Sequence, residues 1–173
     1  MSSNPERERC YGKYRGVVVN NVDPQQIGRI QLIVPDISPL PGSWATPCVP
    51  VAGLSSGVFT VPPVGAAVWV EFEQGDTDSP VWVGGFWGSA AEVPTMARTI
   101  PPGLSGIAIQ TTLGTALVIS DAPGPTGGIL LKTATGAMLS ISDVGITITN
   151  GAGATITLTG PTTDINLGAL TVV

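Results

Sequence analysis

The aromatic residues of this 173-residue chain are confined to its first half, between Tyr11 and Trp87. From Pro101 to Val173 the sequence consists mainly of Ile, Leu and Val alternating with Thr, Ser, Ala and Gly. Such a segment has residues that favour strands, but it lacks the bulky side chains that fill the core of a single chain. We therefore expect its strands to bury their apolar side chains against other copies of the chain.

The overall composition predicts an all-β protein. The chain contains 23 Gly and 16 Pro with regular apolar alternation between them, which is typical of many short strands and turns. Only 11% of the residues are charged, well below the usual quarter, so much of the chain must be kept from water. An obligate oligomer would achieve this.

Several classes of protein are disfavoured by simple counts. No apolar run reaches the roughly 18 residues that a membrane-spanning helix needs, and the N-terminal SSNPERERC is too charged for a signal peptide. The two cysteines, Cys10 and Cys48, are too few for a disulfide framework or a zinc site, and we interpret them as free thiols. The net charge of −5 disfavours binding to a phosphate backbone.

The first half of the chain predicts a small closed barrel. Two strand pairs flank the turn sequences VDPQQIG and GDTDSP, and the Pro- and Gly-rich stretch between the pairs leaves room only for short edge strands. Short strands within about 75 residues match the size of an OB-type barrel, and an SH3-like barrel is the structural alternative. The expected strands are 14–19, 29–34, 45–49, 57–61, 66–73 and 81–87.

Three phrases in this region resemble a known family. They are KYRGVVVNNVDPQQIGRIQLIVPD (13–36), WATPCVPVAG (44–53) and VGAAVWVEFEQGDTDSPVWVGGFWG (64–88), and their order matches the N-terminal OB domain of the baseplate spike family. That family includes the baseplate assembly protein V of contractile phages and the cell-puncturing spike of larger phages. It also includes the valine-glycine repeat spikes of type VI secretion and the spikes of extracellular contractile injection systems.

The second half contains a strand repeat. GTALVISD (114–121) recurs as GAMLSISD (136–143) and, shortened, as GATITLTG (153–160), with GILLKT and GITIT between them. This pattern predicts about seven short strands, each with one buried apolar face and one face of Ser and Thr. The apolar pairs are Leu117 and Ile119, Leu139 and Ile141, Ile146 and Ile148, Ile156 and Leu158, and Ile165 and Leu167.

A single ribbon of such strands would leave two exposed edges, which are templates for aggregation. Three chains wound around one axis would pair every strand and enclose a narrow interior that accepts Ile, Leu, Val and Met but no large aromatic ring. A flat β-sandwich or a single-chain solenoid is the alternative. The family resemblance also implies a trimeric, intertwined β-helix after the OB domain.

Candidate catalytic and metal sites are few. GLSSG around Ser55 fits a hydrolase motif, but the chain has no histidine to act as its base. Glu71 and Glu73 share one strand face and cannot flank a scissile bond, and we interpret Asp76 and Asp78 as turn residues rather than calcium ligands. We therefore expect no enzymatic activity, no cofactor and no metal ion.

The C-terminal residues predict a contact with another protein. Some members of the resembled family end in histidines that hold a metal ion, whereas this sequence ends in GALTVV. Repeated around a threefold axis, these side chains would form an apolar plateau, which usually marks an interaction site. We hypothesise that a tip protein of the PAAR-repeat type binds there, through Leu170, Thr171, Val172 and Val173.

The complete prediction is a homotrimeric baseplate spike of a contractile phage tail or a related injection particle, synthesised in the bacterial cytoplasm without a signal peptide. It would link a hub or tube-initiator protein to the tip, contact the target membrane transiently and pierce the envelope, without binding nucleic acid. The alternatives are a trimeric, tail-fibre-like adhesin that binds glycans and, second, an OB-fold protein that binds nucleic acid. The predicted parts are an N-terminal tail (1–12), an OB domain (13–88), a linker (89–103) and a β-helical shaft (104–173).

Overall fold

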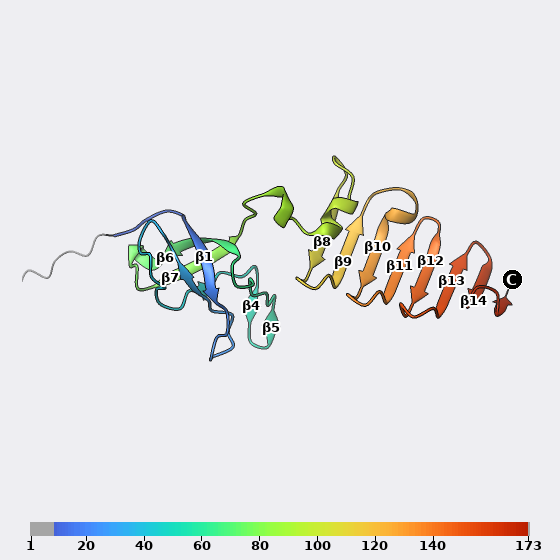
Figure 1. Ribbon diagram of the computed structural model, residues 1–173, viewed down its shortest axis with the longest axis horizontal. Helices are drawn as coiled ribbons and strands as arrows, with labels where there is room; N and C mark the ends of the chain where they lie inside the picture. The colour runs from blue at the N-terminus through green and yellow to red at the C-terminus, as the bar shows by residue number, and fades with distance from the viewer. Residues whose placement is uncertain (1–8, 173) are drawn as a thin grey trace, which may run out of the picture. The chain divides into compact units, whose positions relative to one another are not determined.

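The computed structural model describes residues 9–172, and the chain divides after Gly88 into two compact units (Figure 1). Both units are built from β-strands joined by turns and short 3-10 segments. The all-β prediction is therefore confirmed. Each unit is described by itself.

The first unit is organised around a curled five-stranded sheet in the order β2-β1-β6-β7-β3. Strand β1 pairs antiparallel with both β2 and the central strand β6, β6 pairs antiparallel with β7, and β3 joins β7 in parallel. A register shift between Trp69 and Val70 marks a bulge, which bends a sheet and increases its twist. The bounds are β1 Tyr14–Asn20, β2 Gln31–Ile33, β3 Thr46–Pro47, β6 Ala67–Phe72 and β7 Pro80–Gly85.

The core of the first unit follows from the alternation of its strands. In β6, Val68, Val70 and Phe72 are buried while the residues between them are partly exposed, because successive side chains point to opposite faces. This row packs against residues of β1, β2 and β7 and of the segments next to β2. Ile30 is fully buried among them. The members of the core are Val18, Ile30, Leu32, Val34, Ala45, Val68, Val70, Phe72 and Trp82.

A small hairpin of the first unit differs from the sequence-based expectation. An edge strand was expected at 57–61, but the chain instead forms the two-residue strands β4 (Ala52–Gly53) and β5 (Ser56–Gly57), and residues 58–61 have no regular structure. Gly57 has φ +153°, and a Cβ at this position would lie 2.7 Å from the Val51 carbonyl oxygen. Glycine at 57 therefore allows the hairpin to close. The alternation of apolar residues, on which the predicted strand depended, carries no information about this backbone contact.

The second unit contains an eight-stranded antiparallel sheet whose strands follow one another in chain order (Figure 1). The sequence pattern predicted about seven strands. The additional strand is β8, which lies before the recognised repeat. The bounds are β8 Gly106–Gln110, β9 Ala116–Ser120, β10 Gly128–Lys132, β11 Met138–Ser142, β12 Gly145–Thr149, β13 Thr155–Thr159, β14 Thr162–Ile165 and β15 Leu170–Val172.

Glycines at the starts of strands allow this sheet to turn tightly. Gly128 opens β10 with φ +79°, and a Cβ there would lie 2.0 Å from the Ile141 carbonyl oxygen of β11. Gly145 opens β12 with φ +147°, and its Cβ would lie 2.2 Å from the Leu158 carbonyl oxygen of β13. Close approach of neighbouring backbones thus explains the glycines that begin GILLKT and GITIT. The recurring glycines of the repeat itself, Gly114, Gly136 and Gly153, instead have positive φ and no neighbouring atom closer than 3.8 Å to an added Cβ.

Among residues 9–172, four 3-10 segments complete the fold, and two of them contact the second sheet, η3 at one end and η4 at β11. The segment η3 contacts β8 and β9, and the Gln110 side-chain oxygen accepts hydrogen bonds from the Met96 amide and the Thr95 hydroxyl. Residues 89–103, expected to be a linker, therefore include a part that is docked on the sheet. The segments are η1 Glu73–Gly75, η2 Ala90–Glu92, η3 Thr95–Thr99 and η4 Gly124–Thr126.

Candidate trimer interface

One face of the eight-stranded sheet carries two continuous rows of aliphatic side chains. Residues paired directly across neighbouring strands point to the same face, and so do residues two apart along a strand. The pairing register therefore aligns the rows without a break from β8 to β15. The first row is Ile107, Ile119, Ile129, Ile141, Ile146, Leu158, Thr163 and Val172, and the second is Ile109, Leu117, Leu131, Leu139, Ile148, Ile156, Ile165 and Leu170.

All of these residues except Thr163 are Ile, Leu or Val, and none is charged. In the single chain much of this aliphatic face is open to solvent, with Ile109 60% and Ile148 45% exposed. A contiguous apolar surface of this extent is rare on a monomeric soluble protein and marks an interaction site. The aliphatic face is thus the main solvent-exposed apolar surface of the second unit.

The opposite face of the sheet has a different chemistry. Its middle row begins with Ala108, Val118 and Leu130 and continues with Ser140, Thr147, Thr157 and Asp164. Val118 is buried, and the strand that carries it contacts η3. From β11 onward this face presents mainly Ser and Thr, together with Met138 and Asp164, and the hydroxyl groups can hydrogen-bond to water. The sheet therefore has one face suited to burial and one suited to solvent.

The predicted tip-contact residues fall within β15, which is an edge strand of the sheet. Leu170 and Val172 are exposed, and their side chains end the two rows of the aliphatic face. The backbone of Thr171 pairs with Asp164, and Val173 lies outside the described residues. The sequence-based pairing of Ile165 with Leu167 is wrong, because the chain turns at Asn166 and Leu167, both with positive φ.

Side-chain hydrogen bonds hold that turn. The Asp164 carboxylate accepts from the Gly168 amide at 2.8 Å, and the Asn166 side-chain oxygen accepts from the Thr155 amide at 3.0 Å. Asn and Asp favour such turns, since their short side chains hydrogen-bond nearby backbone groups. Leu167 is left exposed by this turn.

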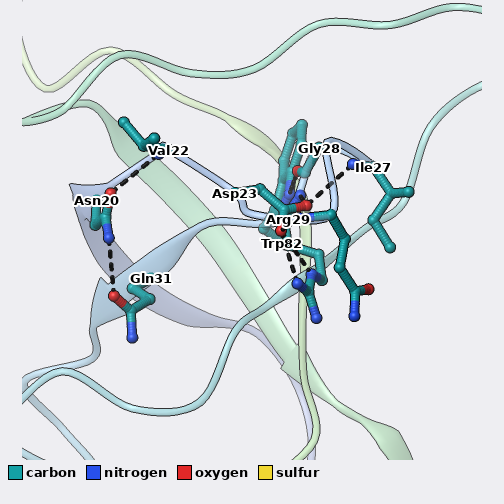
Figure 2. Close-up of polar contacts among 9 residues, drawn as sticks. Asn20, Val22, Asp23, Ile27, Gly28, Arg29, Gln31 and Trp82 are labelled. Atoms are coloured by element: carbon teal, nitrogen blue, oxygen red, sulfur yellow. Dashed lines mark hydrogen bonds and ion pairs between the residues drawn. The ribbon is translucent and has the colours of Figure 1, made fainter.

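In the first unit, a polar clip fixes the loop between β1 and β2 (Figure 2). The buried Asp23 carboxylate accepts hydrogen bonds from the amides of Gln25, Ile27 and Arg29 and from the Arg29 guanidinium, with Nη2 at 2.7 Å. The Arg29 contact, aided by the backbone amides and opposed by burial, lowers the pKa of Asp23 far below its usual range. The Asp23 carboxylate is therefore ionised at neutral pH.

Two further contacts brace the same loop (Figure 2). The buried Trp82 side chain donates from Nε1 to the Gly28 carbonyl oxygen at 3.2 Å, and the Asn20 side chain bonds Gln31 at 3.0 Å. The loop is thus tied to the core of the first unit through β7. The sequence pattern predicted a turn here, but the Asp23 clip was not predicted.

The exposed face of the same sheet carries paired cations. The Arg15 guanidinium lies 5.6 Å from the Trp69 ring centroid and 5.4 Å from that of Phe86, and Lys13 Nζ lies 2.5 Å from Glu71 Oε1. Such cation–π and ion-pair contacts on a surface stabilise by about 1 kcal/mol or less. The charges of Arg15 and Lys13 are thus already paired with groups of the same unit.

The candidate catalytic residues lie in turns or in an ion pair. Ser55 sits at the turn of the β4–β5 hairpin with φ +55°, Glu71 pairs with Lys13, and Asp76 accepts a hydrogen bond from the Asp78 amide within a turn. Among residues 9–172, no group of three His, Cys, Asp or Glu side chains is arranged to hold a metal ion.

Two family models match the chain, one to each unit. Residues 14–87 match the type VI secretion system/phage-baseplate injector OB domain, and residues 106–171 match the phage baseplate V C-terminal trimerisation domain. Comparison with curated proteins gave no match. The chain is thus an OB domain followed by a trimerisation domain of the baseplate type. It belongs to the baseplate spike family of contractile phage tails and related injection machines.

These matches confirm the family resemblance and the OB domain, and they decide against the SH3-like alternative. The family is structural, its members are components of the tail baseplate, and the trimerisation match supports a homotrimer. The β-helical winding of three chains stays a prediction. In the described part of the chain, no helix is long and apolar enough to span a membrane.

Proposed function

We propose that the protein is the homotrimeric central spike of a contractile injection particle. The observation that carries this proposal is the aliphatic face of β8–β15, which a single chain leaves open to water. Three copies that turn this face toward a common axis would bury it and leave the Ser and Thr face outside. The match of residues 106–171 to a trimerisation domain supports this arrangement.

The proposed role is mechanical. The OB domains (13–88) form a collar on a hub or tube-initiator protein, the segment 89–103 connects the collar to the shaft, and the shaft (104–173) points forward. When the tail contracts, the spike is driven against the target envelope and contacts its membrane transiently. In the proposed trimer the strands of each chain stay hydrogen-bonded to their neighbours in chain order, and burial of the three aliphatic faces against one another holds the sheets together under load.

The forward end of the shaft is proposed to bind a separate tip protein of the PAAR-repeat type through Leu170, Thr171, Val172 and Val173. The exposed Leu170 and Val172 on the edge strand β15 support this contact. Removal of residues 170–173 should abolish tip-protein binding while the trimer persists. Undiminished binding by the truncated protein would contradict the proposed contact.

The trimer itself is tested by mass and by resistance to detergent. Sedimentation equilibrium at micromolar concentration should give three times the chain mass of 17.6 kDa. Gel electrophoresis in SDS without boiling should retain a trimer band, because a fully paired sheet unfolds slowly. A folded monomer in the ultracentrifuge would refute the proposed function.

A further inference from the structure

The first unit carries an apolar arm that its own fold does not bury. We define the arm as residues 51–59, which include the β4–β5 hairpin and have Val51, Leu54, Val58 and Phe59 exposed. Leu54 lies at the hairpin turn and is 99% exposed. No Asp, Glu, Lys or Arg occurs from Ile37 to Val70, so the arm is also remote in sequence from any charge. Interface cores are depleted of charged residues in the same way.

The hairpin presents Leu54 in a fixed way. Ala52 pairs with Gly57 and Gly53 with Ser56, so Leu54 and Ser55 form a two-residue turn. Ser55 takes φ +55° and Gly57 takes φ +153°, a backbone that few other sequences would adopt. A side chain held on a tight hairpin loses little conformational freedom on docking, which favours its use as an anchor.

An apolar groove of about 370 Å³ lies along the base of the arm. One wall is formed by the arm itself (Val51, Ala52 and residues 55–59), and the rest of the lining is Ile27, Gly28, Pro47, Val49 and Thr60. Leu54 is not among its lining residues, so the anchor does not fill the groove of its own chain. The volume exceeds that of one leucine side chain.

The groove is pre-formed rather than loose. The Asp23 clip fixes the Ile27 amide at 3.0 Å, as the dashed line in Figure 2 shows, and Trp82 holds the Gly28 carbonyl. Phe59 packs over Gly28, where a Cβ would lie 3.4 Å from its ring. These contacts hold the backbone under the exposed Ile27 in one place, so that wall of the groove exists before any partner binds.

From these observations we propose that Leu54 of one copy inserts into the groove of the next copy, so that three arms and three grooves close a ring within the trimer. An anchor and a groove on different parts of one surface make a head-to-tail contact, and such a contact closes when the copies are related by threefold rotation. This inference rests on the proposed homotrimer.

The occupant is a second copy of this chain because the trimer brings the copies together. Once the trimerisation domains associate, each first unit is tethered to two others through a short connecting segment. Tethering of this kind gives effective concentrations on the order of millimolar, at which even a weak apolar contact is occupied. A partner free in solution would have to compete with this tethered neighbour.

The first test compares the reactivity of two engineered thiols in the intact protein. Cys10 and Cys48 are replaced by serine, and Leu54→Cys or Leu40→Cys is introduced. In the single chain Leu54 is 99% and Leu40 70% exposed, so a free arm predicts that the thiol at 54 reacts with maleimide at least as fast. The proposal predicts the reverse order in the trimer, with position 54 about tenfold slower because it is buried.

The second test is a covalent cross-link. In the same serine background, the pair Leu54→Cys and Ile27→Cys should give covalent trimers after mild oxidation and boiling in SDS without reductant. The matched pair Leu54→Cys and Leu40→Cys should not, because Leu40 does not line the groove.

The outcomes separate the two proposals. A trimeric mass with a fast-reacting thiol at 54 and no covalent trimer would overturn the arm contact and leave the proposed function standing. In that case the arm would be open to another protein. A monomeric mass would refute the proposed function and the arm contact together.

Discussion

Ile148 offers the sharpest test of the aliphatic face. It lies in β12, in the second row between Leu139 and Ile156. Its neighbour Thr147 lies on the same strand and points to the opposite face, where it pairs with Ser140 and Thr157. We therefore compare Ile148→Asp with the matched control Thr147→Asp, two changes that add the same charge one residue apart.

The size of the effect can be worked out from exposure. Ile148 is 45% exposed in the single chain. Burying that remainder removes roughly 80 Å² of apolar surface, which at about 25 cal/mol per Å² is about 2 kcal/mol per chain and about 6 kcal/mol per trimer. The variant loses this term and also places three carboxylates together in an apolar interior, which adds several kcal/mol. A loss of 6 kcal/mol alone lowers the association constant about 10⁴-fold.

Sedimentation equilibrium at micromolar concentration measures this effect. We expect the Ile148→Asp chain to be largely monomeric or aggregated, and the Thr147→Asp chain to keep the trimeric mass of wild type. The reasoning would be refuted by equal association of the two variants, since that would mean the two faces of the sheet have the same surroundings.

Three further predictions concern stability. The lowered pKa of Asp23 in the folded state means that its stabilisation is fully present above the ordinary aspartate pKa of about 3.9 and is lost as the pH falls toward the lower folded value. The stability difference between wild type and Asp23→Asn, from urea titrations, should therefore be constant from pH 8 to about 5 and should shrink below about pH 4; an unchanged difference at low pH would argue against the clip. Gly128→Ala forces a Cβ against a backbone carbonyl of β11 and should destabilise the second unit by more than about 2 kcal/mol, whereas Gly114→Ala, where nothing lies within 4 Å, should cost about 1 kcal/mol from its positive φ alone; equal thermal melting of the two variants would contradict this. Trp82→Phe removes the hydrogen bond to the Gly28 carbonyl and should lower the free energy of unfolding of the first unit by about 1 kcal/mol in urea, with a neutral result showing that water replaces the indole.

The alternation of the second half was sufficient to predict which residues share a face. Leu117 with Ile119 and Leu139 with Ile141 lie on the aliphatic face as expected, because a strand's side chains alternate with a period of two. The same rule failed at Leu167. Alternation cannot detect that the carboxylate of Asp164 and the amide of Asn166 take over backbone hydrogen bonds and turn the chain first.

The first unit was harder to predict in its loops than in its strands. The patterns around β1 and β6 located those strands, since apolar and polar residues alternate clearly there. The Asp23 clip was missed, although an aspartate at the start of a turn with an arginine six residues later was a usable signal. Residues 57–61 were expected to form an edge strand, whereas the structure has a short hairpin at 52–57, because strand formation depends on surroundings that local sequence does not encode.

The neighbour-only pairing of β8 to β15 has a consequence for how this part of the molecule can vary in length. Each strand bonds only to the strands before and after it in the chain, so deletion or duplication of two adjacent strands would leave all other pairings unaltered and restore the direction of the chain. At a spacing of about 4.8 Å between strands, each such step changes the extent of the sheet by about 10 Å. Insertion or deletion of strand pairs would thus change the length of the second unit in fixed steps, while the sequences at its two ends stay the same.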